Sequence, residues 1–232
     1  MTLSEPRREN PAWKYEDLAL FLGAMLPCFT AALVLVHAIR FPSDGVQTMT
    51  LQFVFYVLLL GALYALVAGR YHQPFWRSLG WTVPSSGTWL CIITGPFLAI
   101  GLAVLSALLH APEEPVIQNL MTDRMSLIAV VVFGSFLAPV FEELVFRGFI
   151  FPLVARSLGA WPGILLTALA FALLHGSQFH WSWQSILIIG LAGIAFGLAR
   201  YKTGSTAAAT AIHIGYNSTL FVAFLVQRVV GR

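Results

Sequence analysis

Seven long runs of apolar residues constrain the fold of this 232-residue chain more than any other feature. A helix needs about 20 apolar residues to cross the hydrocarbon core of a bilayer. The runs cover residues 18–39, 49–69, 88–110, 126–157, 161–175, 184–200 and 205–226. They lack the period-two alternation of an outer-membrane barrel. We therefore predict an all-α, polytopic transmembrane bundle of about seven helices, within a range of six to eight.

The composition argues against the soluble alternatives. Hydrophobic residues make up 58% of the chain and charged residues 10%, whereas about a quarter of the residues of a soluble domain are charged. Such a chain has too little polar surface to cover itself in water, which argues against a soluble enzyme, a disordered chain and a nucleic-acid-binding protein. The two cysteines, Cys28 and Cys91, fall inside apolar runs, where we expect them to pack as small apolar residues.

The polar and basic residues predict the organisation and the orientation of the chain. Residues 1–17 are expected to form a polar N-terminal tail, and residues 18–232 a single transmembrane domain. If the N-terminus is cytoplasmic, eight Lys and Arg residues fall on the inner side and four on the outer side. Cytoplasmic loops are enriched in basic residues, so this count favours a cytoplasmic N-terminus. We expect a multi-pass protein of a bacterial inner (cell) membrane, with membrane lipids as its surroundings.

Three charged side chains lie near the middle of the fourth run, namely Glu142, Glu143 and Arg147. Each would cost roughly 2.5–3.5 kcal/mol at the centre of a bilayer, so they are expected to face a protein interior and to be paired. Glu143 and Arg147 are four residues apart and can form an ion pair on one helical face. With Arg147 paired to Glu143, no cation in the same run is left to pair with Glu142, which is therefore a candidate functional carboxylate. The alternative is that all three charged residues form a purely architectural network.

Polar residues in the later runs complete a candidate site. His175 ends the fifth run, four residues after Phe171, while His213 and Asn217 lie four residues apart in the last run. In one chemistry, Glu142 and His175 act as general base on a water, and His213 and Asn217 donate hydrogen bonds to an oxyanion. In the other, Glu142, His175 and His213 bind zinc, and the metal activates the water.

Three motifs resemble those of a known family. Residues 142–147 (EELVFR), 171–175 (FALLH) and 213–217 (HIGYN) resemble the E-E-x-x-x-R, F-x-x-x-H and H-x-x-x-N motifs of the CPBP family, the CAAX proteases and bacteriocin-processing enzymes. They occur in the family's order inside apolar runs, within a core of about 126–221. The resemblance implies an intramembrane endopeptidase of the glutamic type, similar to the eukaryotic Ras-converting CAAX endopeptidase, without a metal cofactor.

The resemblance also implies a role for each motif residue. Glu142 and His175 would activate water, and His213 and Asn217 would form the oxyanion hole. Three residues would order the site: Glu143, Arg147 and Phe171.

The implied substrate is a membrane-associated or C-terminally lipid-modified protein or peptide. Two alternatives stay open: a zinc-dependent membrane protease that uses the same residues, and a non-catalytic immunity or scaffold protein in which the polar network is structural. A transporter is disfavoured because the charges cluster in one place and do not trace a path.

Overall fold

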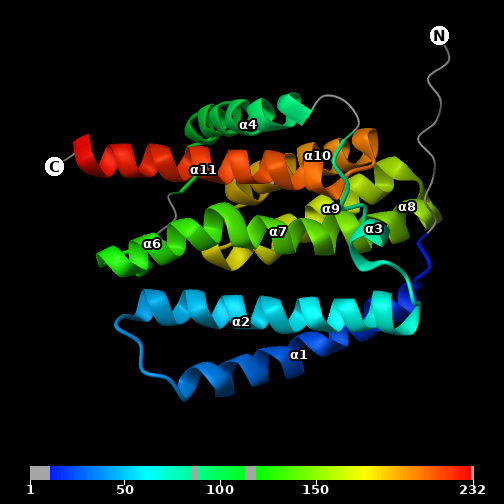
Figure 1. Ribbon diagram of the computed structural model, residues 1–232. Coiled ribbons are helices and arrows are strands. Elements are labelled where there is room, and N and C mark those ends of the chain that lie inside the picture. The colour runs from blue at the N-terminus through cyan, green and yellow to red at the C-terminus, as the bar shows by residue number, and fades with distance from the viewer. Residues whose placement is uncertain (1–10, 85–87, 113–118, 231–232) are drawn as a thin grey trace, which may run out of the picture.

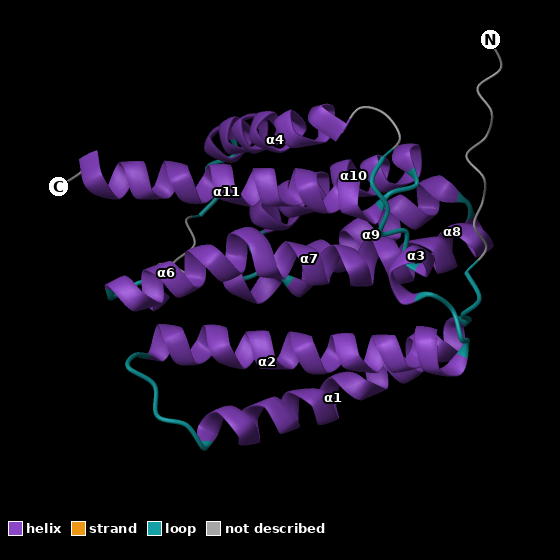
Figure 2. Ribbon diagram, viewed as in Figure 1, coloured by secondary structure: helices purple, strands orange, loops and turns teal. Residues whose placement is uncertain are grey.

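The computed structural model describes residues 11–84, 88–112 and 119–230, which form helices and loops but no strand (Figure 2). The first half contains α1 (Tyr15–His37), α2 (Asp44–Tyr64), the π-helical η1 (Ala65–Arg70), α3 (Phe75–Ser78) and α4 (Thr88–Leu108). The second half contains α6 (Arg124–Val132), η2 (Phe133–Leu137), α7 (Ala138–Glu143), η3 (Leu144–Ile150), α8 (Phe151–Leu158), α9 (Ala160–Leu174), η4 (Gly176–Phe179), α10 (Trp183–Thr203) and α11 (Thr206–Val230). The all-α prediction is confirmed.

Six helices within the described ranges are long and apolar enough to cross a membrane. They are Tyr15–His37, Asp44–Arg70, Leu90–Leu108, Arg124–Leu158, Trp183–Thr203 and Thr206–Val230. Their outer faces carry large apolar side chains, such as Leu26, which is 73% exposed, and Phe97, which is 72% exposed. Exposure of such side chains to water is unfavourable in free energy, whereas their contact with lipid chains is not. The chain is therefore an integral, multi-pass membrane protein, as predicted.

The fifth apolar run forms a helix shorter than the other six. α9 has 15 residues, which gives a length of about 22 Å against a hydrocarbon core of about 30 Å. Its leucines nevertheless face outward, with Leu165 50% and Leu169 51% exposed. The apolar helices thus number six full spans and one shorter helix among the described residues, which lies within the predicted range.

Two glycines, Gly193 and Gly197, let α10 pack closely against α9. A Cβ atom on Gly193 would lie 3.1 Å from Cα of Ala168, and one on Gly197 would lie 3.1 Å from Cγ2 of Ile164. These distances are shorter than an ordinary carbon–carbon contact. The backbone of α10 can therefore lie close to α9, and its carbonyl groups can reach side chains in the interior of the bundle.

The fourth helix, Arg124–Leu158, occupies the middle of the bundle. In Figure 1 it lies between α2 and α11, and α4 lies on the far side of α11. Its 35 residues span about 50 Å at 1.5 Å per residue. Two π-helical segments, η2 and η3, interrupt it, and Pro139 and Pro152 follow them. Such segments often mark functional sites, and here they flank Glu142 and Glu143.

The segment before α1 packs against the fourth helix. Trp13 is 1% exposed, and its Nε1–H donates to the carbonyl of Phe149 at 2.9 Å. The Arg156 guanidinium donates to the carbonyls of Pro11 and Trp13 at 2.9 and 3.2 Å. Residues 1–10 of the predicted tail lie outside the described residues, and the division into a tail and one domain stays a prediction.

A buried carboxylate organises the first turn of α1. Asp17 accepts hydrogen bonds from the backbone N–H of Lys14 at 2.7 Å and from the hydroxyl of Tyr71 at 2.5 Å, and it pairs with Arg70 at 3.3 Å. The hydrogen bond to this carboxylate is the main cause of the raised pKa of Tyr71. These contacts join the start of α1 to the end of η1.

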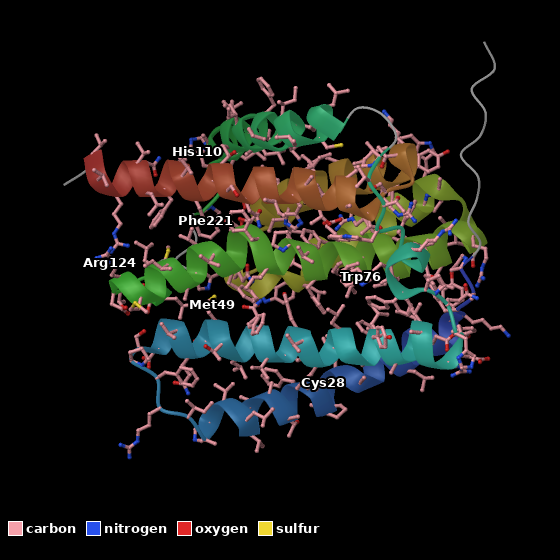
Figure 3. The ribbon with its side chains drawn as sticks, in the orientation of Figure 1. Cys28, Met49, Trp76, His110, Arg124 and Phe221 are labelled. Atoms are coloured by element: carbon pink, nitrogen blue, oxygen red, sulfur yellow. The ribbon has the colours of Figure 1, made fainter. Side chains whose placement is uncertain are left out.

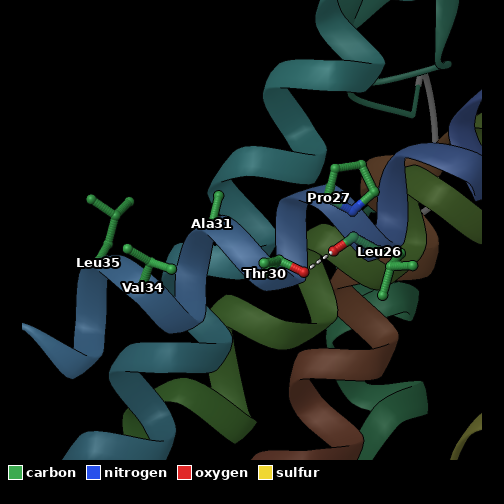
Figure 4. Close-up of a pocket in the computed structure, with 6 residues that line it drawn as sticks. All are labelled: Leu26, Pro27, Thr30, Ala31, Val34 and Leu35. Carbon is green, nitrogen blue, oxygen red and sulfur yellow. Dashed lines mark hydrogen bonds between the residues drawn. The ribbon is translucent and has the colours of Figure 1, made fainter.

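The middle of α1 carries an apolar depression of about 690 Å³ around Pro27 (Figure 4). All six lining residues belong to α1: Leu26, Pro27, Thr30, Ala31, Val34 and Leu35. None of the predicted site residues lines it. Because Leu26 and Val34 are largely exposed, this surface is suited to contact with lipid chains. Cys28, labelled in Figure 3, and Cys91 are free and pack with apolar clusters, as predicted.

Candidate active site

A fully buried ion pair forms the base of the candidate site. Arg147 Nη1 lies 2.9 Å from Glu143 Oε1, and both side chains are 0% exposed. The predicted ion pair is therefore confirmed. Arg147 Nη2 also donates to the carbonyl of Gly193 at 2.7 Å. The pair uses one hydrogen bond, because Glu143 Oε2 and Arg147 Nε have no hydrogen-bond partner among the described residues.

Three aromatic rings surround the Arg147 guanidinium. Its Cζ lies 5.8 Å from the ring centre of Phe146, 5.0 Å from that of Phe171 and 5.4 Å from that of Phe196. The negative faces of aromatic rings attract cations at such distances. Phe171, which was predicted to order the site, thus contacts the cation that neutralises Glu143.

His213 connects the two carboxylates. Its Nδ1 lies 2.9 Å from Glu143 Oε1, and because a carboxylate oxygen accepts, Nδ1 carries the proton. Its Nε2 lies 3.8 Å from Glu142 Oε2, at ion-pair distance. The imidazole stacks on Phe196, with ring centres 4.4 Å apart and an angle of 19°. The orientation of the ring is therefore held, with Nε2 toward Glu142.

Glu142 receives a hydrogen bond from α2, which the sequence analysis missed. The hydroxyl of Tyr56 donates to Glu142 Oε1 at 3.2 Å, and Gln52 Nε2 donates to that hydroxyl at 3.2 Å. The Tyr56 ring stacks on Phe141, with ring centres 4.0 Å apart. A signal did exist, because Gln52 and Tyr56 are polar residues four apart in an apolar run and so share a helical face.

His175 stands at the C-terminal end of α9, half-buried. Its Nδ1 lies 2.8 Å from the carbonyl of Phe171, which can only accept, so Nδ1 carries the proton and Nε2 of the neutral ring is an acceptor. The Phe171 ring lies 4.5 Å from the His175 ring and 5.7 Å from the His213 ring, centre to centre. No hydrogen bond or ion pair joins His175 to Glu142 within the described part of the chain.

Asn217 binds a carbonyl that η2, the first π-helical segment of the fourth helix, leaves without its usual donor. The N–H of Ala138 donates five residues back, to Phe133, and the next residue, Pro139, has no N–H. The carbonyl of Gly134 instead accepts from Asn217 Nδ2 at 2.8 Å. His213 and Asn217 therefore have different partners, although an amide has two N–H groups and this bond uses only one.

The zinc alternative lacks its ligand set. No group of three or more His, Cys, Asp or Glu side chains among the described residues is placed to hold a metal ion. Glu142, His175 and His213 all lie within those residues, so they do not form the predicted cluster. The reason is local, because His213 is bound to Glu143 and the Phe171 ring lies beside both imidazoles.

Comparison with known proteins bears on the same part of the chain. Residues 124–219 match the family model for type II CAAX prenyl endopeptidases, described as Rce1-like. This segment extends from the first residue of α6 into α11 and contains all seven predicted site residues. A search of curated proteins finds no match, and neither does a search of solved structures.

Proposed function

We propose that this chain is an intramembrane protease of the Rce1-like CAAX type, because residues 124–219 match that family model and six of its helices are long and apolar enough to cross a membrane. We further propose that it hydrolyses its substrate by water that Glu142 and His175 activate. One observation carries the proposal. Glu142 is 9% exposed within an apolar bundle, and it lies beside a second carboxylate that Arg147 already neutralises. A carboxylate held in this way is available for proton transfer.

In the first step of the proposed reaction, Glu142 and His175 accept hydrogen bonds from the attacking water. Glu142 takes a proton from a water molecule, with the His175 Nε2 lone pair as a second acceptor, and the water oxygen bonds to the scissile carbonyl carbon. The carbonyl oxygen becomes an oxyanion, which the second N–H of Asn217 stabilises. His213 also donates to it from Nε2 when the ring is an imidazolium, with protons on both nitrogens. The carbon–nitrogen bond then breaks as the proton passes to the departing amine.

The proposed task of the buried ion pair is to hold His213. Glu143 Oε1 accepts from both Arg147 and His213, so the guanidinium fixes the carboxylate and the carboxylate fixes the imidazole. Phe171 and Phe196 contact both the guanidinium and the His213 ring. Such packing restricts the side chains to one arrangement, which a catalytic site needs.

The proposed substrate is a membrane-associated or C-terminally lipid-modified protein or peptide. The matching family model is that of type II CAAX prenyl endopeptidases, whose description names a prenyl group. The outer surface of the bundle is apolar. The direct test uses purified protein with a farnesylated CAAX-type peptide and the same peptide without the lipid. A parallel comparison of membrane proteomes from cells with the wild-type protein or the Glu142→Gln variant would reveal uncut substrates. If the two proteomes are identical and neither peptide is cut, the chain is a non-catalytic immunity or scaffold protein.

We further propose that the end of the bundle where α1 begins is cytoplasmic. Six basic residues belong to this end, namely Lys14, Arg70, Arg77, Arg156, Arg200 and Lys202. Three belong to the opposite end, namely Arg40, Arg124 and Arg228. Figure 3 shows Trp76 at the first end and Arg124 at the other. Basic residues collect on the cytoplasmic side of a membrane. A bacterial inner membrane as the location stays a prediction.

Replacement of Tyr56 by phenylalanine is expected to lower kcat about ten- to a hundred-fold with little change in KM. The hydroxyl touches Glu142, and a hydrogen bond to a charged group contributes about 1.5–3 kcal/mol. The matched control is Tyr64→Phe on the same helix, because Tyr64 is 56% exposed and packs on Phe75. Equal values of kcat for the two variants would show that the Tyr56 hydroxyl has no role in the reaction.

Replacement of Asn217 by alanine is expected to lower kcat about 10²–10³-fold, the usual effect of losing one oxyanion donor. Its neighbour Ser218 is the control, since the buried Ser218 Oγ has no hydrogen-bond partner among the described residues, and Ser218→Ala should keep the wild-type rate. Because Asn217 also binds the Gly134 carbonyl, the thermal unfolding temperature must be measured in parallel. A less stable variant with an unchanged kcat would assign Asn217 a structural role only.

A further inference from the structure

A pocket of about 430 Å³ lies at the end of the bundle where the chain enters α1. The residues of its lining that matter here are Trp13, Gln73, Arg77, Ser78, Pro152 and Arg200. Two guanidinium groups and no carboxylate belong to the lining among the described residues. None of the residues proposed for catalysis lines the pocket, so it is a separate feature of the molecule.

The segment η3, the second π-helical segment of the fourth helix, explains why the Arg200 guanidinium lies inside the bundle. The N–H of Phe151 donates five residues back, to Phe146, and Pro152 has no N–H. The carbonyl of Arg147 accepts instead from Arg200 Nε at 3.2 Å. Arg200 is consequently 8% exposed, although it belongs to the last turn of α10. Its side chain is held in place and does not extend into solvent.

The loop after α3 closes over the same guanidinium. Gly80 has φ +70°, and a Cβ atom at this position would lie 2.6 Å from Arg200 Nη2. The carbonyl of Gly80 accepts from the backbone N–H of Thr206 at 2.8 Å, which ties the loop to the start of α11. Only glycine fits both the backbone conformation and the space. The loop therefore packs directly against the Arg200 guanidinium, which also lines the pocket.

We propose that this pocket binds a phosphate group, carried by the headgroup of an anionic phospholipid or by a soluble phosphate ester. The planar guanidinium of arginine matches phosphate oxygens in geometry and charge. The pocket lies at the level where lipid headgroups are expected, because the rings of Trp76 and Trp81, 5.7 Å apart, belong to the same loop region. Basic pockets between transmembrane helices are known to suit lipid headgroups.

The test measures binding to the purified full-length protein in detergent by native mass spectrometry. Dioleoylphosphatidylglycerol is the anionic probe, and dioleoylglycerol, which has no phosphate group, is the reference lipid. We expect Arg77→Gln to weaken phosphatidylglycerol binding at least about tenfold, because one charged hydrogen-bond donor is lost. Arg77 is exposed, so its replacement leaves the interior intact. Lys202→Gln is the matched control, since it removes one exposed positive charge from the same end without touching the pocket.

A competition arm separates the two sources of phosphate. Displacement of phosphatidylglycerol by glycerol 1-phosphate would show that the phosphate group alone is bound, and failure to displace it would show that the pocket needs the lipid. Gln73→Ala gives a second variant, expected to weaken binding a few-fold in the same direction. The proposal is overturned if Arg77→Gln loses no more affinity than Lys202→Gln, or if the wild-type protein binds the two lipids equally.

Discussion

The Glu142→Gln variant is expected to fold normally and to cleave its substrate about 10²–10⁴-fold more slowly than the wild-type protein. Glutamine has the shape of glutamate, and its amide oxygen can still accept from the hydroxyl of Tyr56, so the contact with α2 is kept. An amide cannot take a proton from water at neutral pH, so the general-base contribution is lost. The measurement is the single-turnover rate with the substrate that the proteome comparison identifies.

The adjacent carboxylate provides the matched control for this experiment. Glu143 is 0% exposed and accepts from Arg147 and His213, so Glu143→Gln should lower the stability as well as the rate. Glu142→Gln should lower the rate alone. A Glu142→Gln variant that cleaves at the wild-type rate contradicts the catalytic role, and one that fails to fold shows instead that the network is architectural.

Spacing along single helices predicted part of the site correctly. Glu143 and Arg147 are four residues apart and form the expected ion pair, and Phe171 and His175 lie together at the end of α9. Such contacts depend only on helical geometry, so the sequence suffices to find them. His213 and Asn217 are also four residues apart, but their hydrogen-bond partners, Glu143 and the Gly134 carbonyl, belong to another helix and could not be predicted from spacing. Their joint role stays a prediction.

Contacts between helices could not be read in this way. Tyr56 lies 86 positions before Glu142, which it binds from α2, and the Gly193 carbonyl binds Arg147 from α10. Which faces of α2 and α10 turn toward the fourth helix depends on packing across the whole bundle. The polar residues were visible in the sequence, but the pairing required the three-dimensional arrangement.

The prolines of the fourth helix are visible in the sequence, but the sequence does not determine how each changes the helix. A proline such as Pro139 or Pro152 is compatible with a kink, a break or a wider turn. Here each follows a π-helical segment, and a carbonyl five residues before each proline binds a side chain from a later helix. Asn217 binds the Gly134 carbonyl, and Arg200 binds the Arg147 carbonyl. The π-helical segment before Pro139 thus holds a residue of the candidate active site, and the one before Pro152 holds a residue of the basic pocket.

The Arg147→Met variant is expected to lose about 3–5 kcal/mol in the free energy of unfolding. Methionine fills much of the same space among the rings of Phe146, Phe171 and Phe196, but it leaves the charge of Glu143 buried without its cation. Denaturant titration in detergent, followed by tryptophan fluorescence, measures the loss. Lys202→Met, which removes an exposed positive charge, should change the free energy of unfolding by less than about 0.5 kcal/mol.

The double variant Glu143→Gln/Arg147→Met distinguishes a buried charge from lost packing as the cause. If the unpaired carboxylate is responsible, removing it should return the free energy of unfolding toward the wild-type value, because an ion pair replaced as a whole often costs little. The glutamine oxygen can still accept from His213 Nδ1, so the imidazole keeps its orientation. A double variant less stable than Arg147→Met alone would mean that Glu143 stabilises the bundle without its cation, and that Arg147 acts through its packing among the three rings.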